Sequence, residues 1–257
     1  MSMNAQRVIA EEAPSKASFA KLGIEGLEFV LGGGLPEDAV YLLTGAPGTH
    51  YTTFAHQAIY NHLLQGGKAV YYTPDLASNQ IQEDMALYGW KVRRYVDEES
   101  LLFSRPLAPP LQKLAETMPE NPMEEVVNLG STTDAIRKSF VGKLKDHRWS
   151  ILNLSYLMTV YPSQEIIDLV LFWVNAVHVF GGVHFILLPR EGHEGNQVTL
   201  LENMVDGVLN FKFAQGFLQA EGEVEVKKLR RVRLKSRVFR HTVQDNGIVI
   251  ENATRIG

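Results

Sequence analysis

Two hydrophobic patterns alternate along the first 205 residues of the chain. Short continuous apolar runs predict strands that are buried on both faces, and these lie near 39–43, 68–73, 100–104, 149–154 and 183–188. Longer segments with apolar residues three or four apart predict helices, and these lie near 27–31, 54–65, 78–88, 132–146, 164–180 and 198–204. Strands that alternate with helices indicate an α/β protein with a mainly parallel sheet flanked by helices.

The pattern changes near residue 207, where strands follow one another without helices. We expect them near 208–213, 217–219, 225–235 and 239–250, and Asp245-Asn246-Gly247 is typical of a hairpin turn. The region of about 207–252 therefore predicts an antiparallel, β-rich C-terminal edge of the same sheet.

The ends of this pattern suggest the domain organisation. Residues 1–20 are polar with few core-forming side chains, which predicts a flexible lead-in before a single domain over 21–257. The proline-bearing segment 105–130 predicts a loop with broken helix.

Composition narrows the class of protein. The 257 residues are 45% hydrophobic and include no cysteine, which excludes a disulfide framework and thiolate chemistry. We find no secretory signal, so we expect a cytoplasmic protein. The run between Asp168 and Arg190 lacks charged residues and could span a bilayer by length, but Gly181-Gly182 divides it. We expect a buried helix and strand there, and no membrane partner.

Charge is unevenly distributed. The 25 basic and 29 acidic residues give a net charge of −4, although 227–240 hold eight basic residues and no acidic one. We call 227–240 the basic ribbon. Its alternation predicts a strand with Arg233, Lys235 and Arg237 on one face.

A glycine loop follows the first apolar run, in the strand–loop–helix context of a phosphate-binding loop. It consists of Gly45, Ala46, Pro47, Gly48, Thr49, His50, Tyr51, Thr52 and Thr53. The pattern G-x-x-x-x-G-K-[ST] is matched at its first glycine and at Thr52. His50 stands where the second glycine is expected, and Tyr51 stands where the lysine is expected.

The chain resembles the KaiC/RadA-like branch of the RecA-type ATPases. The segments that carry the resemblance are GIEGLEFVLGGGLPEDAVYLLTGAPGT, QGGKAVYYTPDLASNQI, MALYGWKVRRYVDEESLLF, ENMVDGVLNF and LRRVRLKSRVFRHTVQDNGIVI. The resemblance implies a RecA-like P-loop NTPase core and a tendency to form rings or complexes with paralogues.

The resemblance also assigns chemical roles, and several positions depart from them. Tyr51 is neutral where the family's lysine would neutralise phosphates. The family's acidic pair falls on Asp75 and Leu76. Its Walker B aspartate falls on Leu152 or, one residue on, on Asn153. These departures predict a degenerate ATP site with no catalytic residues, in which Tyr51 either packs in the phosphate space or leaves a loop that still binds ATP, ADP or phosphate weakly.

The basic ribbon has three interpretations. Its cations can be a solvated sheet face paired with acids such as Glu221, Glu223 and Glu225. By resemblance, Lys235-Ser236-Arg237 is similar to a K-x-R element that contacts the neighbouring subunit's nucleotide. Nucleic-acid backbone contact is the third, although no interleaved aromatic residues support it.

These observations favour a non-catalytic assembly, regulatory or adaptor subunit that acts through protein contacts. Its partner would be a second copy, an active paralogue, or another protein or peptide. The alternatives are a weak ATP-binding protein or ATPase, and a recombinase paralogue that binds DNA in repair. We expect no metal site, because His50, His56 and His62 are six residues apart and do not share a helix face.

Overall fold

The computed structural model describes residues 18–107, 124–128, 132–190, 195–214, 221–234 and 237–251. The strands of its main sheet are β3 (Ala39–Gly45), β4 (Ala69–Tyr72), β5 (Leu101–Leu107), β6 (Glu124–Asn128), β7 (Trp149–Asn153), β8 (Val183–Pro189), β9 (Gly207–Phe213), β10 (Glu221–Leu229), β11 (Val238–Gln244) and β12 (Gly247–Ile250). The helices are α1 (Leu27–Leu31), α2 (Tyr51–Leu64), α3 (Ser78–Ala86), α4 (Arg93–Asp97), α6 (Asp134–Leu144), α7 (Ser155–Val160), α8 (Ser163–Phe180) and α9 (Gly195–Met204). Two short strands, β1 (Phe19–Ala20) and β2 (Leu35–Pro36), form a separate pair.

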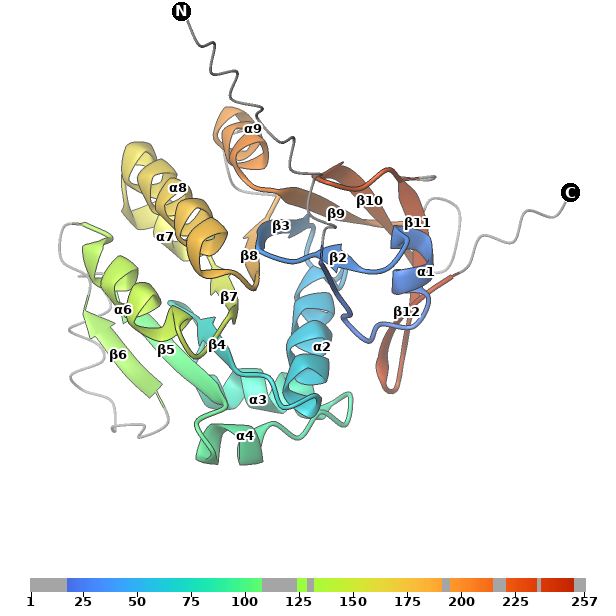
Figure 1. Cartoon of the computed structure of the whole chain (residues 1–257), viewed down its shortest axis with the longest axis horizontal. Coiled ribbons are helices and arrows are strands. Elements are labelled where there is room, and N and C mark those ends of the chain that lie inside the picture. Colours follow the sequence, from blue (N-terminus) through green and yellow to red (C-terminus); the bar gives the residue numbers. More distant parts are fainter. Residues whose placement is uncertain are drawn as a thin grey trace, which may run out of the picture.

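The ten strands of the main sheet follow the order β12-β11-β10-β9-β3-β8-β7-β4-β5-β6 (Figure 1). All pairs between β9 and β6 are parallel, and those between β9 and β12 are antiparallel. This arrangement confirms the predicted α/β class with its antiparallel C-terminal edge. The hairpin predicted at Asp245-Asn246-Gly247 joins β11 to β12.

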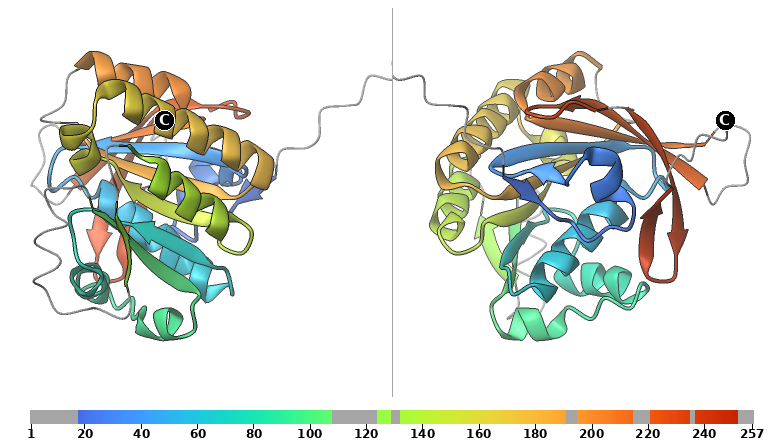
Figure 2. Two further views of the ribbon diagram at one scale, coloured as in Figure 1. Left: turned by 90° about the vertical axis from the view of Figure 1, so that its left-hand side faces the viewer. Right: turned by 45° about the vertical axis from the view of Figure 1, so that its right-hand side comes forward.

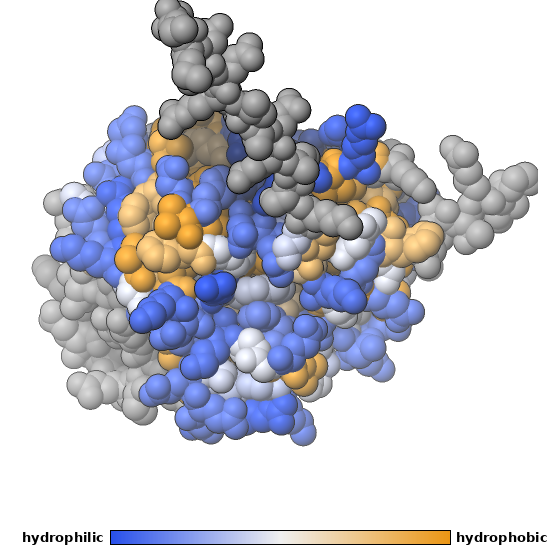
Figure 3. Space-filling view, viewed as in Figure 1, coloured by the Kyte–Doolittle hydropathy of each residue, from blue (hydrophilic) through white to orange (hydrophobic). Residues whose placement is uncertain are grey.

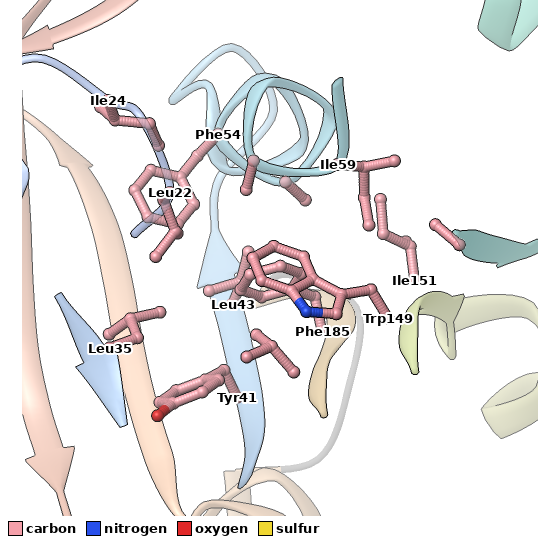
Figure 4. Close-up of a cluster of buried hydrophobic side chains, with 14 of the residues drawn as sticks. Leu22, Ile24, Leu35, Tyr41, Leu43, Phe54, Ile59, Trp149, Ile151 and Phe185 are labelled. Carbon is pink, nitrogen blue, oxygen red and sulfur yellow. The ribbon is translucent and has the colours of Figure 1, made fainter. Parts of the chain in front are cut away.

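Helices cover both faces of the sheet, because the central strands are apolar on both sides. Along β3, Tyr41 and Leu43 pack into one buried cluster with side chains of α1 to α4, whereas Val40 and Leu42 pack into a second with those of α6 to α9. Figure 2 shows the two groups of helices on opposite sides of the sheet, and Figure 4 shows the first cluster around Tyr41, Leu43 and Phe185.

The uncharged run between Asp168 and Arg190 forms α8 and β8, as predicted. In the described part of the chain, α8 is the one helix long and apolar enough to span a membrane by length and composition alone. One face of α8 is buried in the second cluster. Apolar side chains also gather on the outer surface over α8 (Figure 3), where Leu171, Val179 and Phe180 are exposed.

The last strand is attached to the first long helix. Gln57 in α2 is buried, and its side-chain amide exchanges two hydrogen bonds with the backbone of Ile248: Nε2 donates to the carbonyl at 3.2 Å, and Oε1 accepts from the N–H at 2.7 Å. The N–H of Ile250 donates to the carbonyl of Glu25 at 2.9 Å. These bonds fix β12 against segments from the beginning of the described chain.

Two sequence predictions in these segments differ from the structure, and two short helices were not predicted. The segment 105–130 is not all loop, because β5 continues to Leu107 and pairs with β6. Pro106 is tolerated there, since it lies beyond Ser104, where the pairing of β5 with β4 ends. Residues 19–20 form β1 rather than belonging to a lead-in. The short helices α4 and α7 were not predicted, because their five and six residues are too few for a clear period. The predicted strand near 217–219 and residues 1–17 lie outside the described residues.

Candidate functional site

The glycine loop lies at the carboxyl end of β3, between that strand and α2. Ligands of open α/β sheets bind at this edge. Thr49 closes the turn, since its Oγ1 donates to the Ala46 carbonyl at 2.7 Å and its N–H donates to the same oxygen at 3.2 Å. A Cβ at Gly45 would lie 2.3 Å from Thr49 Oγ1 and 3.0 Å from the Phe211 carbonyl, so this position requires glycine. Pro47 and Gly48 are exposed at the tip of the loop.

His50 has the backbone conformation that the glycine pattern expects at its position. Its φ of 67° and ψ of 17° are left-handed, and it is the N-terminal cap of α2 without a side-chain capping bond. The His50 ring is half-buried and lies edge-on to the buried ring of His241, with 6.4 Å between centroids. The histidine therefore keeps the turn of the loop and adds a side chain beside it.

Tyr51 lies in the first turn of α2 and packs back over the loop. Its ring contacts the first buried cluster, and its Cδ1 lies 3.1 Å from the position that a Cβ would take at Gly45. Burial raises the pKa of the Tyr51 phenol, as does the charge of Asp75, against a lowering effect of the hydrogen bond with Thr52. The Tyr51 phenol therefore stays protonated and neutral at neutral pH, and it carries no charge that could replace that of a lysine. Thr52 and Thr53, beside it, are half-buried.

Asp75 and Asn153 meet beyond the carboxyl ends of β4 and β7. Asn153 Nδ2 lies 2.9 Å from both carboxylate oxygens of Asp75 and donates to them. Thr73 Oγ1 donates to Asp75 Oδ1 at 3.5 Å. Desolvation by the surrounding protein raises the pKa of Asp75, and these hydrogen bonds lower it. Leu152 is fully buried in the second cluster, so of the two register alternatives Asn153 is the residue that reaches the site.

A pocket of about 490 Å³ opens beside the loop, on the side of β9. The described residues that line it are Ala46, Thr49, Arg190, Asn210, Phe211, Lys212 and Phe213. Sequence analysis missed Arg190 and Lys212. Neither residue belongs to a sequence motif. Arg190 directly follows β8 and Lys212 is near the end of β9, and the structure shows that these two strands flank β3.

The basic ribbon does not form the predicted strand. β10 ends at Leu229, and the described residues 230–234 form a turn and irregular chain, so Arg233 does not share a strand face with Arg237. Arg231 takes a left-handed conformation with φ of 65°, and its guanidinium donates to the carbonyls of Glu37 and Asp38. These contacts divert the chain from the extended course that alternation predicted. Lys235 lies outside the described residues.

Several cations of the basic ribbon have partners within the chain. Lys227 Nζ lies 2.6 Å from Glu202 Oε1, and Arg230 donates to Asp206 at 3.2 Å. The acids of these two pairs are thus Glu202 and Asp206, while Glu225 pairs with Lys212 at the pocket. Arg237 donates to the carbonyl of Lys227 at 3.1 Å.

The described residues contain no group of three or more His, Asp or Glu side chains that could hold a metal ion. His56 and His62 are separately placed in α2. His56 Nε2 lies 3.1 Å from the Tyr71 hydroxyl, and the His62 ring stacks on Trp149 with 4.1 Å between centroids.

Comparison with known proteins finds several relatives by sequence. The chain is 40% identical over 78 residues to the UPF0273 protein PF1931 of Pyrococcus furiosus, a match that covers 30% of this chain and 32% of that protein. The chain thus spans about a third of the first relatives that it matches. A longer match, to the UPF0273 protein SSO1861 of Saccharolobus solfataricus, has 21% identity and covers 90% of this chain and 82% of that protein.

Structure comparison finds a solved protein of the same fold. The KaiC-like protein PH0186 of Pyrococcus horikoshii has a TM-score of 0.72 at 20% identity, over 92% of this chain and 100% of that one, which establishes a common fold. A family model described as "ATPase: KaiC" matches residues 20–255, nearly the whole chain. This protein therefore belongs to the KaiC family of RecA-type P-loop ATPases.

Proposed function

We propose that this KaiC-family protein does not hydrolyse ATP at its own loop and acts as a non-catalytic assembly or regulatory subunit through contacts with other protein chains. The partner would be a second copy of the chain or an active paralogue. Family membership supports the association, and the residues at the loop support the loss of hydrolysis.

The observation that carries the proposal is the hydrogen-bonded pair of Asp75 and Asn153. A hydrated magnesium ion near phosphates is held by carboxylates, and a second acid or a polar group orients the attacking water. Here an amide stands at the end of β7 and its Nδ2 donates to both oxygens of the one carboxylate. Leu76 offers no second acid. These residues do not fit a magnesium ion, so we derive no catalytic step through one.

The loop supports the same conclusion from the phosphate side. A lysine at position 51 would form charge-assisted hydrogen bonds worth about 1.5–3 kcal/mol each. Tyr51 is neutral and folds over Gly45, where it occupies space beside the loop. His50, Tyr51 and Asn153 all differ from the family pattern, and all three differences affect the same activity, the hydrolysis of ATP.

The test of lost hydrolysis is phosphate release from magnesium-ATP by the full chain. We expect no release above that of Thr52→Ala, which lacks the hydroxyl that a metal would need. The matched control is His50→Gly/Tyr51→Lys, which should bind magnesium-ATP about tenfold more tightly than the native protein if the loop keeps its fold. Turnover by the native protein that Thr52→Ala abolishes would refute the proposal.

The test of assembly is the molar mass in solution, measured by light scattering, with and without a KaiC-family paralogue from the same organism. We expect a homo-oligomer or a mixed complex. A monomer that stays monomeric at tens of micromolar and does not bind the paralogue would contradict the subunit role.

A further inference from the structure

The pocket beside the loop has a positive lining. Of its described lining residues, Arg190 and Lys212 are charged and none is acidic. A pocket of about 490 Å³ falls within the range of small-molecule sites, roughly 300–1,000 Å³. Its charge favours an anion.

Arg190 is fixed at the root of the loop by its backbone. Its N–H donates to the Gly45 carbonyl at 3.1 Å, which places the residue directly beside the start of the glycine loop. Its side chain is exposed, and within the described chain its guanidinium has no ion pair or hydrogen bond. The guanidinium therefore has donors available for a ligand, in the planar arrangement that suits phosphate.

Lys212 supplies the second charge from the opposite wall. Its Nζ lies 2.5 Å from Glu225 Oε2, and this contact is the main reason that the pKa of Glu225 is lowered. The pair is exposed enough for Nζ to contact a ligand as well, since an ammonium group has three donors. Two cations thus face a loop that lacks its own lysine.

The acid of the site lies on the other side of β8 from β3. Asp75 and Asn153 stand at the ends of β4 and β7, and both oxygens of Asp75 accept from the amide. A divalent cation would have to displace this amide and would gain a single carboxylate. Protein cations are therefore better placed than a metal ion to balance the charge of a ligand in the pocket.

We propose that this pocket binds a phosphorylated small molecule without a divalent cation, with Arg190 and Lys212 neutralising its phosphate groups. The inference rests on the proposed function, because a site without metal-assisted hydrolysis has no need of magnesium. Phe213 extends the pocket over the loop, where it is 49% exposed and its Cζ would lie 3.4 Å from a Cβ at Gly48. An apolar or planar part of the ligand would contact this ring.

The test is calorimetric titration of ADP and of inorganic pyrophosphate into the full chain, in EDTA and again in excess magnesium. We expect binding in EDTA that magnesium changes by less than about twofold. Arg190→Gln should weaken it about 10-fold to 100-fold, as expected for the loss of one charge-assisted contact. Arg190→Lys keeps the positive charge and should therefore weaken binding less than Arg190→Gln.

The matched control is Arg233→Gln, which removes one exposed charge from a residue outside the pocket lining. It should leave affinity nearly unchanged, and circular dichroism checks that each variant is folded. Equal affinities for ADP and pyrophosphate would assign recognition to the phosphates alone. If ADP binds more tightly than pyrophosphate, and Phe213→Leu reduces the affinity for ADP, then the Phe213 ring also contacts the ligand.

Three results would overturn the inference: no binding of either probe in EDTA up to about 1 mM, a requirement for magnesium, or equal losses in Arg190→Gln and Arg233→Gln. Phosphate release from ATP is a separate readout. Its appearance would refute the proposed function, whether or not the pocket binds ADP in EDTA.

Discussion

Two carboxylates at opposite ends of the parallel strands are held in different ways. Asp206, at the amino ends of β3 and β9, is 4% exposed and accepts from the Val40 N–H at 3.0 Å and from Arg230 at 3.2 Å, with His178 Nε2 3.0 Å from both oxygens. Asp75, at the carboxyl ends, is exposed and meets the neutral amide of Asn153. Asp206 is thus buried beside a cation and a backbone donor, whereas Asp75 is exposed and paired with a neutral amide. We therefore expect Asp206 to contribute more to the stability of the fold than Asp75.

A change to acid pH should have the largest effect on stability, because four histidines are buried. Burial lowers the pKa of His56, His62, His184 and His241 to about 4. The unfolded state takes up these protons near pH 6.5, so the free energy of unfolding should fall as pH drops from 6.5 towards 4. Each histidine contributes up to about 1.4 kcal/mol per pH unit. Urea midpoints that stay constant between pH 7 and 5 would contradict this.

Removal of each carboxylate tests the comparison directly. We expect Asp206→Ala to lower the free energy of unfolding by about 3 kcal/mol, because it leaves the Val40 N–H and the Arg230 guanidinium without their acceptor. Asp75→Ala should cost less than about 1 kcal/mol, since its side chain is exposed. Urea unfolding of both variants at pH 7 measures the difference. Equal decreases in the free energy of unfolding would show that the two carboxylates stabilise the fold equally.

Restoring the acid at position 153 should be moderately destabilising. In Asn153→Asp the new carboxylate would face Asp75 across the contact that is now 2.9 Å, and repulsion would raise the pKa of one of them. Relative to the native protein at the same pH, the free energy of unfolding of the variant should then fall by about 1–2 kcal/mol as pH rises from about 4 to 7, because the four histidines contribute equally to both proteins. Urea midpoints of the variant and of the native protein, measured over this pH range, check the sign of the difference. If addition of magnesium raises the urea midpoint of the variant again, the two carboxylates at positions 75 and 153 can bind a metal ion.

Replacement of either of two buried histidines should give the smallest change in stability. His241, near the loop, has no partner for either ring nitrogen in the described structure, whereas His184 Nδ1 lies 2.8 Å from Ser150 Oγ. His241→Phe should therefore stabilise the protein by about 1 kcal/mol at pH 7, and His184→Phe should destabilise it because the hydroxyl loses its partner. Thermal midpoints compare them, and a loss of stability in both would mean that His241 is satisfied.

Much of the fold could be predicted because β3, β7 and β8 are continuous apolar runs that signal burial on both faces. The same logic failed where the signal was not local. β6 is short and pairs with β5 across a segment of the chain interrupted by prolines. The basic ribbon alternates like a strand, but the contacts of Arg231 with Glu37 and Asp38 bend it away. Tertiary contacts overrode local propensity in both cases.

The candidate site could be predicted in part. The order of strand, glycine loop and helix correctly predicted that Gly45 to Thr53 lie at the carboxyl ends of the parallel strands. The choice between Leu152 and Asn153 needed the structure, because a one-residue shift in a strand moves a side chain to the opposite face. Arg190 and Lys212 carry no motif, and their position at the pocket follows from the order of β8, β3 and β9, which sequence alone does not give.

The bonds between Gln57 and Ile248 have a consequence for synthesis of the protein. These partners are 191 residues apart, so α2 leaves the ribosome long before the strand that completes its surroundings. Until that strand emerges, the side-chain amide of Gln57 has no final partner and the surface of α2 that β12 covers stays open, and such surfaces promote aggregation. A message truncated before codon 248 would therefore yield a chain that cannot close its core, although it would encode the complete glycine loop.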